Sequence, residues 1–202
     1  MARTVGSSGP KTLAAIRQAG LDLIYRHGYE AMSLRRLAAE VGLREGSLYN
    51  HIASKQELLF SLVDDHMDQL LAAMQEAMEG ITGGEARLRA FVTFHLTYHM
   101  QRQAEVFVIN SELRSLDEAG LKTIVAKRDA YEEALVEILR LGSQEGSFAS
   151  ADCRVAAKAI IAMLTGVCTW FKPEGRLSID QIVPLYIRLV MDGVRGASGS
   201  TA

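Results

Sequence analysis

The sequence predicts an all-α protein of about nine helices, and three observations support this fold class. Apolar residues recur every three and four positions along most of the chain, whereas the alternation typical of strands is hard to find. Only 3 prolines occur among 202 residues. Helix-favouring residues such as Ala, Leu, Glu, Met and Arg are abundant. A chain of this length is expected to form one or two domains with a sizeable core.

Three helices are expected near the N-terminus, separated by glycine breaks. Pro10 suits a first helical turn, and the apolar stripe after it is expected to end at Gly28. Ser33 is a good N-cap for a short helix that Gly42 ends. A third short helix is expected over 44–51. This part of the chain therefore reads as a compact group of three short to medium helices.

Six further helices are predicted downstream. Ser54 and Glu57 form a capping box, and the helix they open meets no breaker until Gly80. The pair Gly83 and Gly84 then separates it from a helix containing Leu88 to His99. A second capping box begins at Ser178, and a loop rich in Ser and Gly is expected over 143–150. The remaining predicted helices cover residues 104–115, 118–141, 152–171 and 178–194.

The charge distribution separates the two ends of the chain. The formal net charge is −2, but residues 1–60 carry eight Lys and Arg against five Asp and Glu. The remainder carries fourteen against nineteen. A basic N-terminal segment on an acidic body is consistent with an anionic partner for the first part alone.

Composition also indicates where the protein works. Cys153 and Cys168 are the only cysteines, and they form no CxxC pair, so neither a disulfide scaffold nor a zinc module is predicted. No signal peptide is visible in the first residues, and no apolar run reaches the roughly 18 residues of a membrane span. We therefore expect a cytoplasmic protein with no membrane partner.

The most informative segment, SLRRLAAEVGLREGSLYNHIASKQEL, is typical of a helix-turn-helix. Ala38 is small enough for a second helix to cross closely, and Gly42 supplies the left-handed backbone of a tight turn. The second helix then leaves polar residues outside, a shape that fits a DNA major groove. Gly46 allows close approach of the backbone to a phosphate, and Lys55 lies in a first helical turn, where it is best explained by an anion. The alternative is a solvated surface helix in an ordinary bundle.

The motif around this turn resembles the signature of the TetR family of transcriptional regulators. It comprises Gly42-x3-Gly46-Ser47-Leu48-Tyr49-x-His51-x2-Ser54-Lys55-x2-Leu58, preceded by Gly28-Tyr29-x2-Met32-Ser33-x3-Leu37-Ala38. The resemblance implies a DNA-binding domain over 1–53, a ligand-binding and dimerisation domain over 54–195, and a tail over 196–202 that we expect to be disordered. The sequence departs from the signature at Ile52-Ala53, where an aromatic and a proline are common, and at Arg44, which leaves the operator preference open.

The resemblance also implies roles for individual residues. Tyr49, His51 and Lys55 are expected to contact DNA phosphates, which set the register of the protein on DNA. Ser33 and Arg44 are expected to assist near phosphates, with Gly46 leaving room for the backbone. The candidates for base edges are Arg44, Glu45, Ser47 and Asn50. A dimer is then expected to read a palindromic double-stranded operator.

A small apolar effector is expected to bind among the aromatic and methionine residues of the C-terminal region. The predicted ligand-binding residues are Phe91, Phe94, His95, Tyr98, Phe107, Asn110, Arg128, Tyr131, Met163, Val167 and Trp170. For any one of them, an ordinary core position is the simpler interpretation. His95 and His99 have the spacing of two metal ligands, but no third ligand is evident and core histidines are favoured, so no metal or other cofactor is predicted.

The last two predicted helices carry more apolar surface than one face requires. An isologous four-helix interface in a homodimer accounts for both stripes, with closure of the monomer core as the alternative. Scattered residues from Arg128 to Ser178 are similar to the branch of the family that senses acyl-CoA thioesters. That similarity implies that Trp170 lines an acyl cavity and that Arg102, Arg128 or Lys172 meets the polar end.

Four functions are therefore weighed. The leading hypothesis is a repressor released from DNA by an apolar effector such as an acyl-CoA. A drug- or metabolite-responsive efflux regulator and a DNA-binding activator or architectural protein without an effector are the nearest alternatives. A small helical enzyme or metal-binding protein is a different class, but no GxSxG, HExxH, phosphate-binding glycine loop or carboxylate pair is found, so no catalytic residue is predicted.

Overall fold

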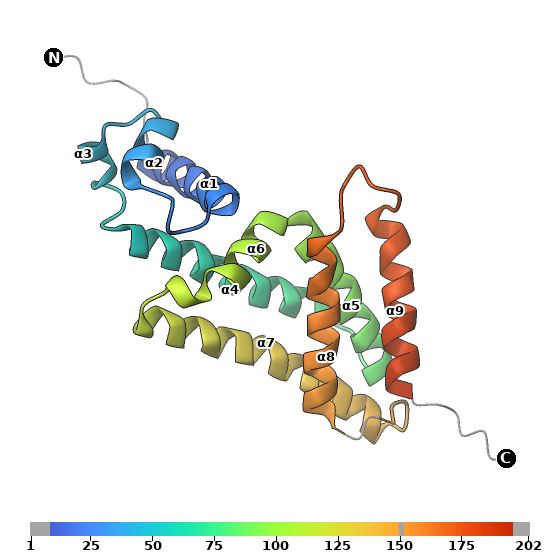
Figure 1. The fold of residues 1–202 in the computed structure, drawn as a ribbon. Helices are drawn as coiled ribbons and strands as arrows, with labels where there is room; N and C mark the ends of the chain where they lie inside the picture. The colour runs from blue at the N-terminus through green and yellow to red at the C-terminus, as the bar shows by residue number, and fades with distance from the viewer. Residues whose placement is uncertain (1–8, 150–151, 196–202) are drawn as a thin grey trace. The chain divides into compact units, whose positions relative to one another are not determined.

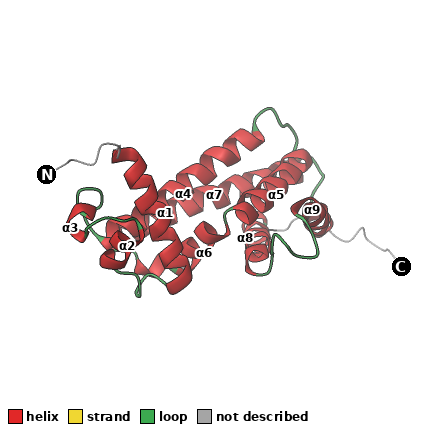
Figure 2. Ribbon diagram, turned by 90° about the horizontal axis from the view of Figure 1, so that it is seen from above, coloured by secondary structure: helices red, strands yellow, loops and turns green. Residues whose placement is uncertain are grey.

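The computed structural model describes residues 9–149 and 152–195. Within these residues the chain forms nine α-helices and two short 3-10 helices joined by loops, and it contains no strand (Figures 1 and 2). The predicted all-α class and the number of helices are confirmed. None of these helices is long and apolar enough to span a bilayer. The predicted tail over 196–202 lies outside the described residues.

The helices follow one another with short connections. They are α1 (Gly9–His27), α2 (Leu34–Glu40), α3 (Glu45–Leu48), α4 (Lys55–Met78), α5 (Gly84–Gln101), α6 (Gln103–Ser111), α7 (Glu118–Gln144), α8 (Cys153–Thr165) and α9 (Ile179–Arg195). The 3-10 helices are η1 (Leu113–Ser115) and η2 (Gly166–Thr169).

The described residues form two compact units, and two long helices contribute to both. The first unit runs to His66 and also includes Ala104–Ile124, whereas the second contains Met67–Gln103 and the chain from Val125 onward. Thus α4 and α7 each begin in the first unit and end in the second. The predicted boundary at residue 53 follows the chain linearly, whereas these units include α6 with the N-terminal helices. The domain limits 1–53 and 54–195 stay a prediction.

The core of the first unit forms where α1, α2 and α3 gather around the beginning of α4 (Figure 1). Ile16, Leu37 and Leu48 are fully buried there. A side chain at Gly20 would place its Cβ 2.8 Å from Leu58 Cδ2, so a glycine lets α1 lie close to α4. The short helices α2 and α3 are therefore held by burial of one apolar face, since helices of this length are not stable alone.

In the second unit, the start of α5 and the end of α7 approach each other closely. A Cβ at Gly84 would lie 2.3 Å from the Cα of Gly142, and a Cβ at Gly142 would lie 2.1 Å from the ring of Phe148. The amide of Gly84 also donates to Glu145 Oε2 at 2.7 Å. Only glycine leaves room for this arrangement, in which the first turn of α5 packs against the last turns of α7.

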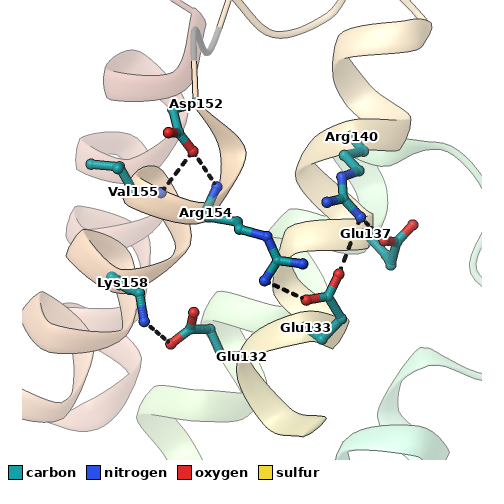
Figure 3. Close-up of polar contacts among 8 residues, drawn as sticks. All are labelled: Glu132, Glu133, Glu137, Arg140, Asp152, Arg154, Val155 and Lys158. Atoms are coloured by element: carbon teal, nitrogen blue, oxygen red, sulfur yellow. Dashed lines mark hydrogen bonds and ion pairs between the residues drawn. The ribbon is translucent and has the colours of Figure 1, made fainter. Parts of the chain in front are cut away.

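Charged side chains join the outer faces of α7 and α8 (Figure 3). Lys158 pairs with Glu132 at 2.9 Å, and Arg154 pairs with Glu133 at 2.8 Å. Arg140 also contacts Glu133 at 3.1 Å. Asp152 caps α8 by accepting the amides of residues 154 and 155. Because these pairs are largely exposed, they orient α8 on α7 more than they stabilise the fold.

Several helix ends differ from the prediction for identifiable reasons. The helix expected to stop at 141 continues to Gln144, because Gly142 provides space for Phe148 and does not terminate the helix. The helix expected over 152–171 narrows to a 3-10 turn at Gly166. The helix expected over 104–115 ends at Ser111 and is followed by η1.

The first capping box is confirmed with one difference, and the second is formed in part. Ser54 Oγ accepts the amide of Glu57 at 3.0 Å, as a capping box requires. The carboxylate of Glu57 reaches back to the amide of Ala53, one residue before the expected partner. In the second box, the amide of Ser178 donates to Gln181 Oε1 at 3.0 Å. The amide of Gln181 donates to the backbone carbonyl of Ser178 at 3.1 Å, in place of the side-chain oxygen that a full capping box uses.

Candidate functional site

The turn between α2 and α3 has the geometry of a helix-turn-helix. Ser33 caps α2, since its Oγ accepts the amide of Arg36 at 3.2 Å. Gly42 has a φ of 68°, the left-handed conformation that favours glycine, and the amide of Leu43 donates to the carbonyl of Ala38 at 2.8 Å. The expected helix over 44–51 is regular only over Glu45–Leu48 and continues as turns to His51.

The predicted DNA-contacting residues surround α3 on the surface of the first unit. Arg44, Glu45 and Asn50 are exposed, and the ring of Tyr49 is 52% exposed. A side chain at Gly46 would meet no atom within 4 Å, so the backbone there is open to a close approach. The other predicted contacts are either exposed, as Ser33 is, or half-buried, as Ser47, His51 and Lys55 are.

Lys55 already has neutral partners. Its Nζ lies 4.2 Å from the centre of the Tyr29 ring and donates to the carbonyl oxygen of Glu30 at 3.2 Å. Within the described residues it forms no ion pair with a carboxylate. The ring and the carbonyl orient the ammonium group but leave its charge uncompensated, so it remains suited to a phosphate.

Two exposed arginines on α2, Arg35 and Arg36, were not among the predicted contacts. Arg36 shares a hydrogen bond of 2.8 Å with His27 Nε2. The dipole of a helix disfavours cations in its first turn. Two adjacent arginines in the first turn of a short helix were therefore the sequence signal for a nearby anion.

In the second unit, a buried polar cluster centres on His95 of α5. Its Nδ1 lies 3.0 Å from the hydroxyl of Tyr131 on α7, and its Nε2 lies 3.2 Å from the hydroxyl of Thr165 on α8. The ring of His99 is stacked on that of His95, with centres 3.8 Å apart and planes inclined by 2°. His99 Nδ1 donates to the backbone carbonyl of His95 at 2.8 Å.

Burial keeps His95 and Tyr131 uncharged. Burial, followed by the neighbouring His99, holds the pKa of His95 well below its ordinary value of 6.5. Burial and the nearby Tyr98 raise the pKa of Tyr131 well above 10.0. At neutral pH, His95 and Tyr131 are therefore both neutral and offer hydrogen bonds without net charge.

Aromatic rings enclose this cluster. Phe91 packs on Tyr131 with ring centres 5.3 Å apart, and Phe94 packs on Tyr98 at the same distance. The guanidinium of Arg102 lies 3.9 Å from the centre of the Tyr98 ring. The structure thus brings together five predicted ligand-binding residues, which are Phe91, Phe94, His95, Tyr98 and Tyr131.

The six other predicted ligand-binding residues divide into two in the first unit, three exposed in the second unit and one buried in the second unit. Phe107 and Asn110 belong to α6 in the first unit, where Phe107 packs edge-on against Tyr25 at 5.2 Å. Arg128, Met163 and Trp170 are exposed, whereas Val167 is buried. His99 and Thr165 were absent from the predicted set, although the spacing of His95 and His99 had placed both histidines on one face.

A separate open hollow of about 1250 Å³ lies in the second unit between the C-terminal halves of α4 and α7. Its apolar lining includes Met74, Met78 and Ile138, and its charged lining includes Arg87. Sequence reasoning had placed the two methionines beside the aromatic cluster. In the structure they line this hollow, which none of the predicted ligand-binding residues reaches.

The helices α8 and α9 each carry apolar side chains on two faces. Ile160 and Leu164 of α8 and Val190 of α9 are buried in the second unit. Val155 of α8 is 63% exposed and Leu189 of α9 is 59% exposed. Closure of the monomer core therefore accounts for one face of each helix, and a second apolar face remains at the surface.

These features define a DNA-binding regulator in which a helix-turn-helix is joined to a second helical unit of the same chain. The family profile "Bacterial regulatory proteins, tetR family" matches residues 16–62, and the profile "Tetracyclin repressor-like, C-terminal domain" matches residues 82–194. Since the second match alone covers more than half of the chain, the protein belongs to the TetR family of transcriptional regulators.

Three similar proteins illustrate the relationship. The transcriptional repressor KstR2 of Mycolicibacterium smegmatis is 26% identical over 85% of both chains. The fatty acid metabolism regulator protein of Bacillus subtilis is 22% identical, covering 92% of this chain and 96% of its own. The structure of AibR with isovaleryl coenzyme A and operator DNA has a TM-score of 0.82 at 28% identity, covering 88% of this chain and 97% of its own.

We predict that His95 makes the stability of the protein depend on pH. An unfolded chain protonates this histidine near pH 6.5, whereas the folded protein resists protonation. The stabilisation is complete above pH 6.5 and is lost as the pH falls below it, at up to about 1.4 kcal/mol per pH unit.

Urea unfolding at pH 7.5 and 5.5 tests this prediction. His95→Gln should be less stable at the higher pH and should lose less stability on acidification than the wild type. His27→Gln, on the exposed end of α1, is the matched control, since glutamine can still accept the bond from Arg36 and no buried hydrogen bond is lost. It should be as stable as the wild type at pH 7.5. An equal loss of stability in wild type and His95→Gln would contradict the prediction.

Proposed function

We propose that the protein is a homodimeric repressor that binds a palindromic operator and is released by a small, largely apolar effector such as an acyl-CoA. The main support is that one chain holds two different features. One is an exposed helix-turn-helix, and the other, in a different compact unit, is a buried and uncharged hydrogen-bonding cluster lined by aromatic rings. The first has the chemistry to read DNA, and the second has the chemistry to hold a ligand.

On the DNA side, Tyr49, His51 and Lys55 hold phosphates and so set the register of the dimer. Ser33 assists them, because its oxygen accepts an amide while its hydroxyl hydrogen is still available to a phosphate. Base edges are read by Arg44, Glu45, Ser47 and Asn50 around α3. The open surface at Gly46 allows the helix to approach the DNA backbone.

On the effector side, the cluster favours an uncharged polar group. The two bonds of His95, to Tyr131 and to Thr165, use two of the three hydrogens of these groups. One of the two hydroxyls therefore keeps a hydrogen that it can donate to a carbonyl such as that of a thioester. The aromatic rings around them suit an acyl chain, while the charged part of a coenzyme A stays outside the buried cluster, since an unpaired phosphate is costly to bury. Two relatives have names that fit an acyl-CoA effector. One is AibR, whose structure contains isovaleryl coenzyme A, and the other is a fatty acid metabolism regulator.

Dimerisation uses the exposed apolar faces of α8 and α9. Val155, Met163 and Leu185 lie at the surface together with Leu189, and a two-fold axis pairs such faces with their own copies. The small residues Ala159 and Ala162 are also exposed and allow close helix packing. Two chains then place two reading helices on successive half-sites of the operator.

Release follows from linkage between the two sites. The effector binds best to the form of the dimer in which the two DNA-reading helices are wrongly spaced for the operator, so it weakens DNA binding. DNA then weakens effector binding by the same factor. The helix α4 is the connection we propose, because it starts beside the phosphate-binding residues and continues into the unit that holds the cluster.

Removal of the proposed phosphate contacts should weaken operator binding. The double variant Tyr49→Phe with Lys55→Ala should lose at least about tenfold in operator affinity, since two phosphate contacts disappear. The slope of log K against log salt should become less negative by about one for the lost lysine. Anisotropy of a labelled duplex, selected from a random-sequence library with the wild type, measures both quantities.

Lys11→Ala, an exposed lysine on the first turns of α1, provides a charge-matched control for the lysine change. The double variant should remain dimeric by light scattering. Unchanged operator affinity in the double variant would contradict the assignment of the DNA-binding residues.

A charge placed in the proposed apolar interface should disrupt the dimer. Leu189→Glu should convert the protein to monomers, because it buries a charge in the proposed apolar interface. Val125→Glu is the control, since Val125 is a 42% exposed residue of α7 outside that interface. Light scattering after gel filtration measures the mass, and far-ultraviolet circular dichroism checks the fold. A Leu189→Glu protein that stays dimeric would argue against the proposed interface.

A further inference from the structure

A closed circuit of hydrogen bonds joins three separate segments of the first unit. The amide of Tyr29 donates to Glu112 Oε1 at 3.2 Å, and the hydroxyl of Ser115 donates to Glu112 Oε2 at 2.9 Å. The hydroxyl of Tyr29 donates to Gln56 Oε1 at 2.8 Å, while Gln56 Nε2 donates to the carbonyl of Ser115 at 3.0 Å. The circuit therefore connects the turn after α1, the first turn of α4 and the segment around η1.

Packing around the circuit leaves little freedom. Tyr29 is 8% exposed, and Glu112 and Ser115 are half-buried. Gly28 precedes Tyr29 with a φ of 79°, and a Cβ on it would lie 3.8 Å from Glu112 Oε1. Burial, with the carboxylates of Glu30 and Glu112, raises the pKa of Tyr29, so its phenol remains a donor. A carboxylate in such surroundings is retained only when its oxygens are hydrogen-bonded.

The circuit leads directly to Lys55. The ammonium group of Lys55 rests 4.2 Å from the centre of the Tyr29 ring and bonds to the carbonyl of Glu30, the residue that follows Tyr29. Both ends of Tyr29 are fixed by the circuit, its amide by Glu112 and its hydroxyl by Gln56. The surface that supports Lys55 is thus held in place from the segment between α6 and α7.

We propose that Glu112 is a positioning residue for operator binding, acting through Tyr29 to orient Lys55. The inference rests on the proposed function, in which Lys55 binds a phosphate. Glu112 lies outside the residues 16–62 matched by the N-terminal family profile and inside the 82–194 matched by the C-terminal one. A residue of the C-terminal region therefore serves the DNA-reading surface.

The sign of the effect separates this role from simple electrostatics. A carboxylate near a phosphate-binding residue repels DNA, so its removal alone strengthens binding. If Glu112 positions Lys55, its loss weakens DNA binding. Removal of the negative charge then raises the affinity for DNA by less than the loss of a fixed Lys55 orientation lowers it. Glutamine keeps both hydrogen bonds, since its oxygen accepts the Tyr29 amide and its NH2 donates to the hydroxyl of Ser115.

The test compares three variants on the duplex selected with the wild type. Glu112→Ala should lose about fivefold to tenfold in operator affinity. Glu112→Gln should stay within about twofold of the wild type. Glu118→Ala removes an exposed carboxylate from the same unit and should bind as tightly as the wild type or slightly more tightly. Tighter binding by Glu112→Ala would overturn the proposal.

A double-mutant cycle with Lys55→Ala identifies the route of the effect. In the Lys55→Ala background, Glu112→Ala should cause no further loss of affinity, because the group it positions is absent. Losses that add without coupling would assign Glu112 a structural role only and overturn the inference.

Hydrogen exchange of the free protein tests the circuit without DNA. Glu112→Ala should speed amide exchange in the segment from Gly28 to Met32, while segments of the second unit keep their wild-type rates. Faster exchange with unchanged operator affinity would overturn the positioning role but leave the proposed function intact. A wild type that selects no duplex would contradict the proposed function itself, and with it the positioning role, whatever the exchange result.

Discussion

The contact between Gly84 and Gly142 is the constraint on which the register of α5 against α7, and with it the buried polar cluster, depends. His95 lies eleven residues after Gly84, and Tyr131 lies eleven residues before Gly142. Eleven residues make about three turns of an α-helix, so antiparallel helices that touch at the two glycines also face each other at His95 and Tyr131. Leu88 and Leu135 fall between these points and are fully buried. One steric fit therefore sets the register that forms the buried polar cluster.

The two units meet different electrostatic demands. Around α3, exposed polar groups and the lysine at position 55 remain available to an anion. In the second unit, the surface charges of α7 and α8 pair with one another (Figure 3), and the interior cluster is kept neutral by burial. Charge is thus kept at the surface and out of the interior of the second unit, as the proposed binding of both a polyanion and an apolar effector requires.

Sequence reasoning succeeded where the signal is local. Helix caps such as Ser33 and Ser54 and the left-handed turn at Gly42 depend on neighbouring residues, and the structure has them as expected. Aromatic residues on one face of α5 were also grouped correctly, because helical periodicity places them together. In the same way, the helix-turn-helix motif carried enough local information to indicate its family.

What failed depended on packing between distant segments. The helix expected over 118–141 was ended too early, since nothing nearby in sequence reveals that Gly142 lies inside α7 with Phe148 in the space beside it. Phe107 was grouped with the aromatic residues of α5, although α6 belongs to the first unit. The link from Glu112 to the N-terminal helices gave no signal, because its partner Tyr29 lies 83 residues away in the sequence.

The most direct test of the central claim is titration of straight-chain acyl-CoAs of increasing length into the protein–operator complex, with operator anisotropy as the readout. The account predicts release that depends on chain length, and operator DNA should weaken acyl-CoA binding by the same factor. Release by planar apolar drugs alone would point to an efflux regulator. An operator complex that no acyl-CoA dissociates would contradict the account.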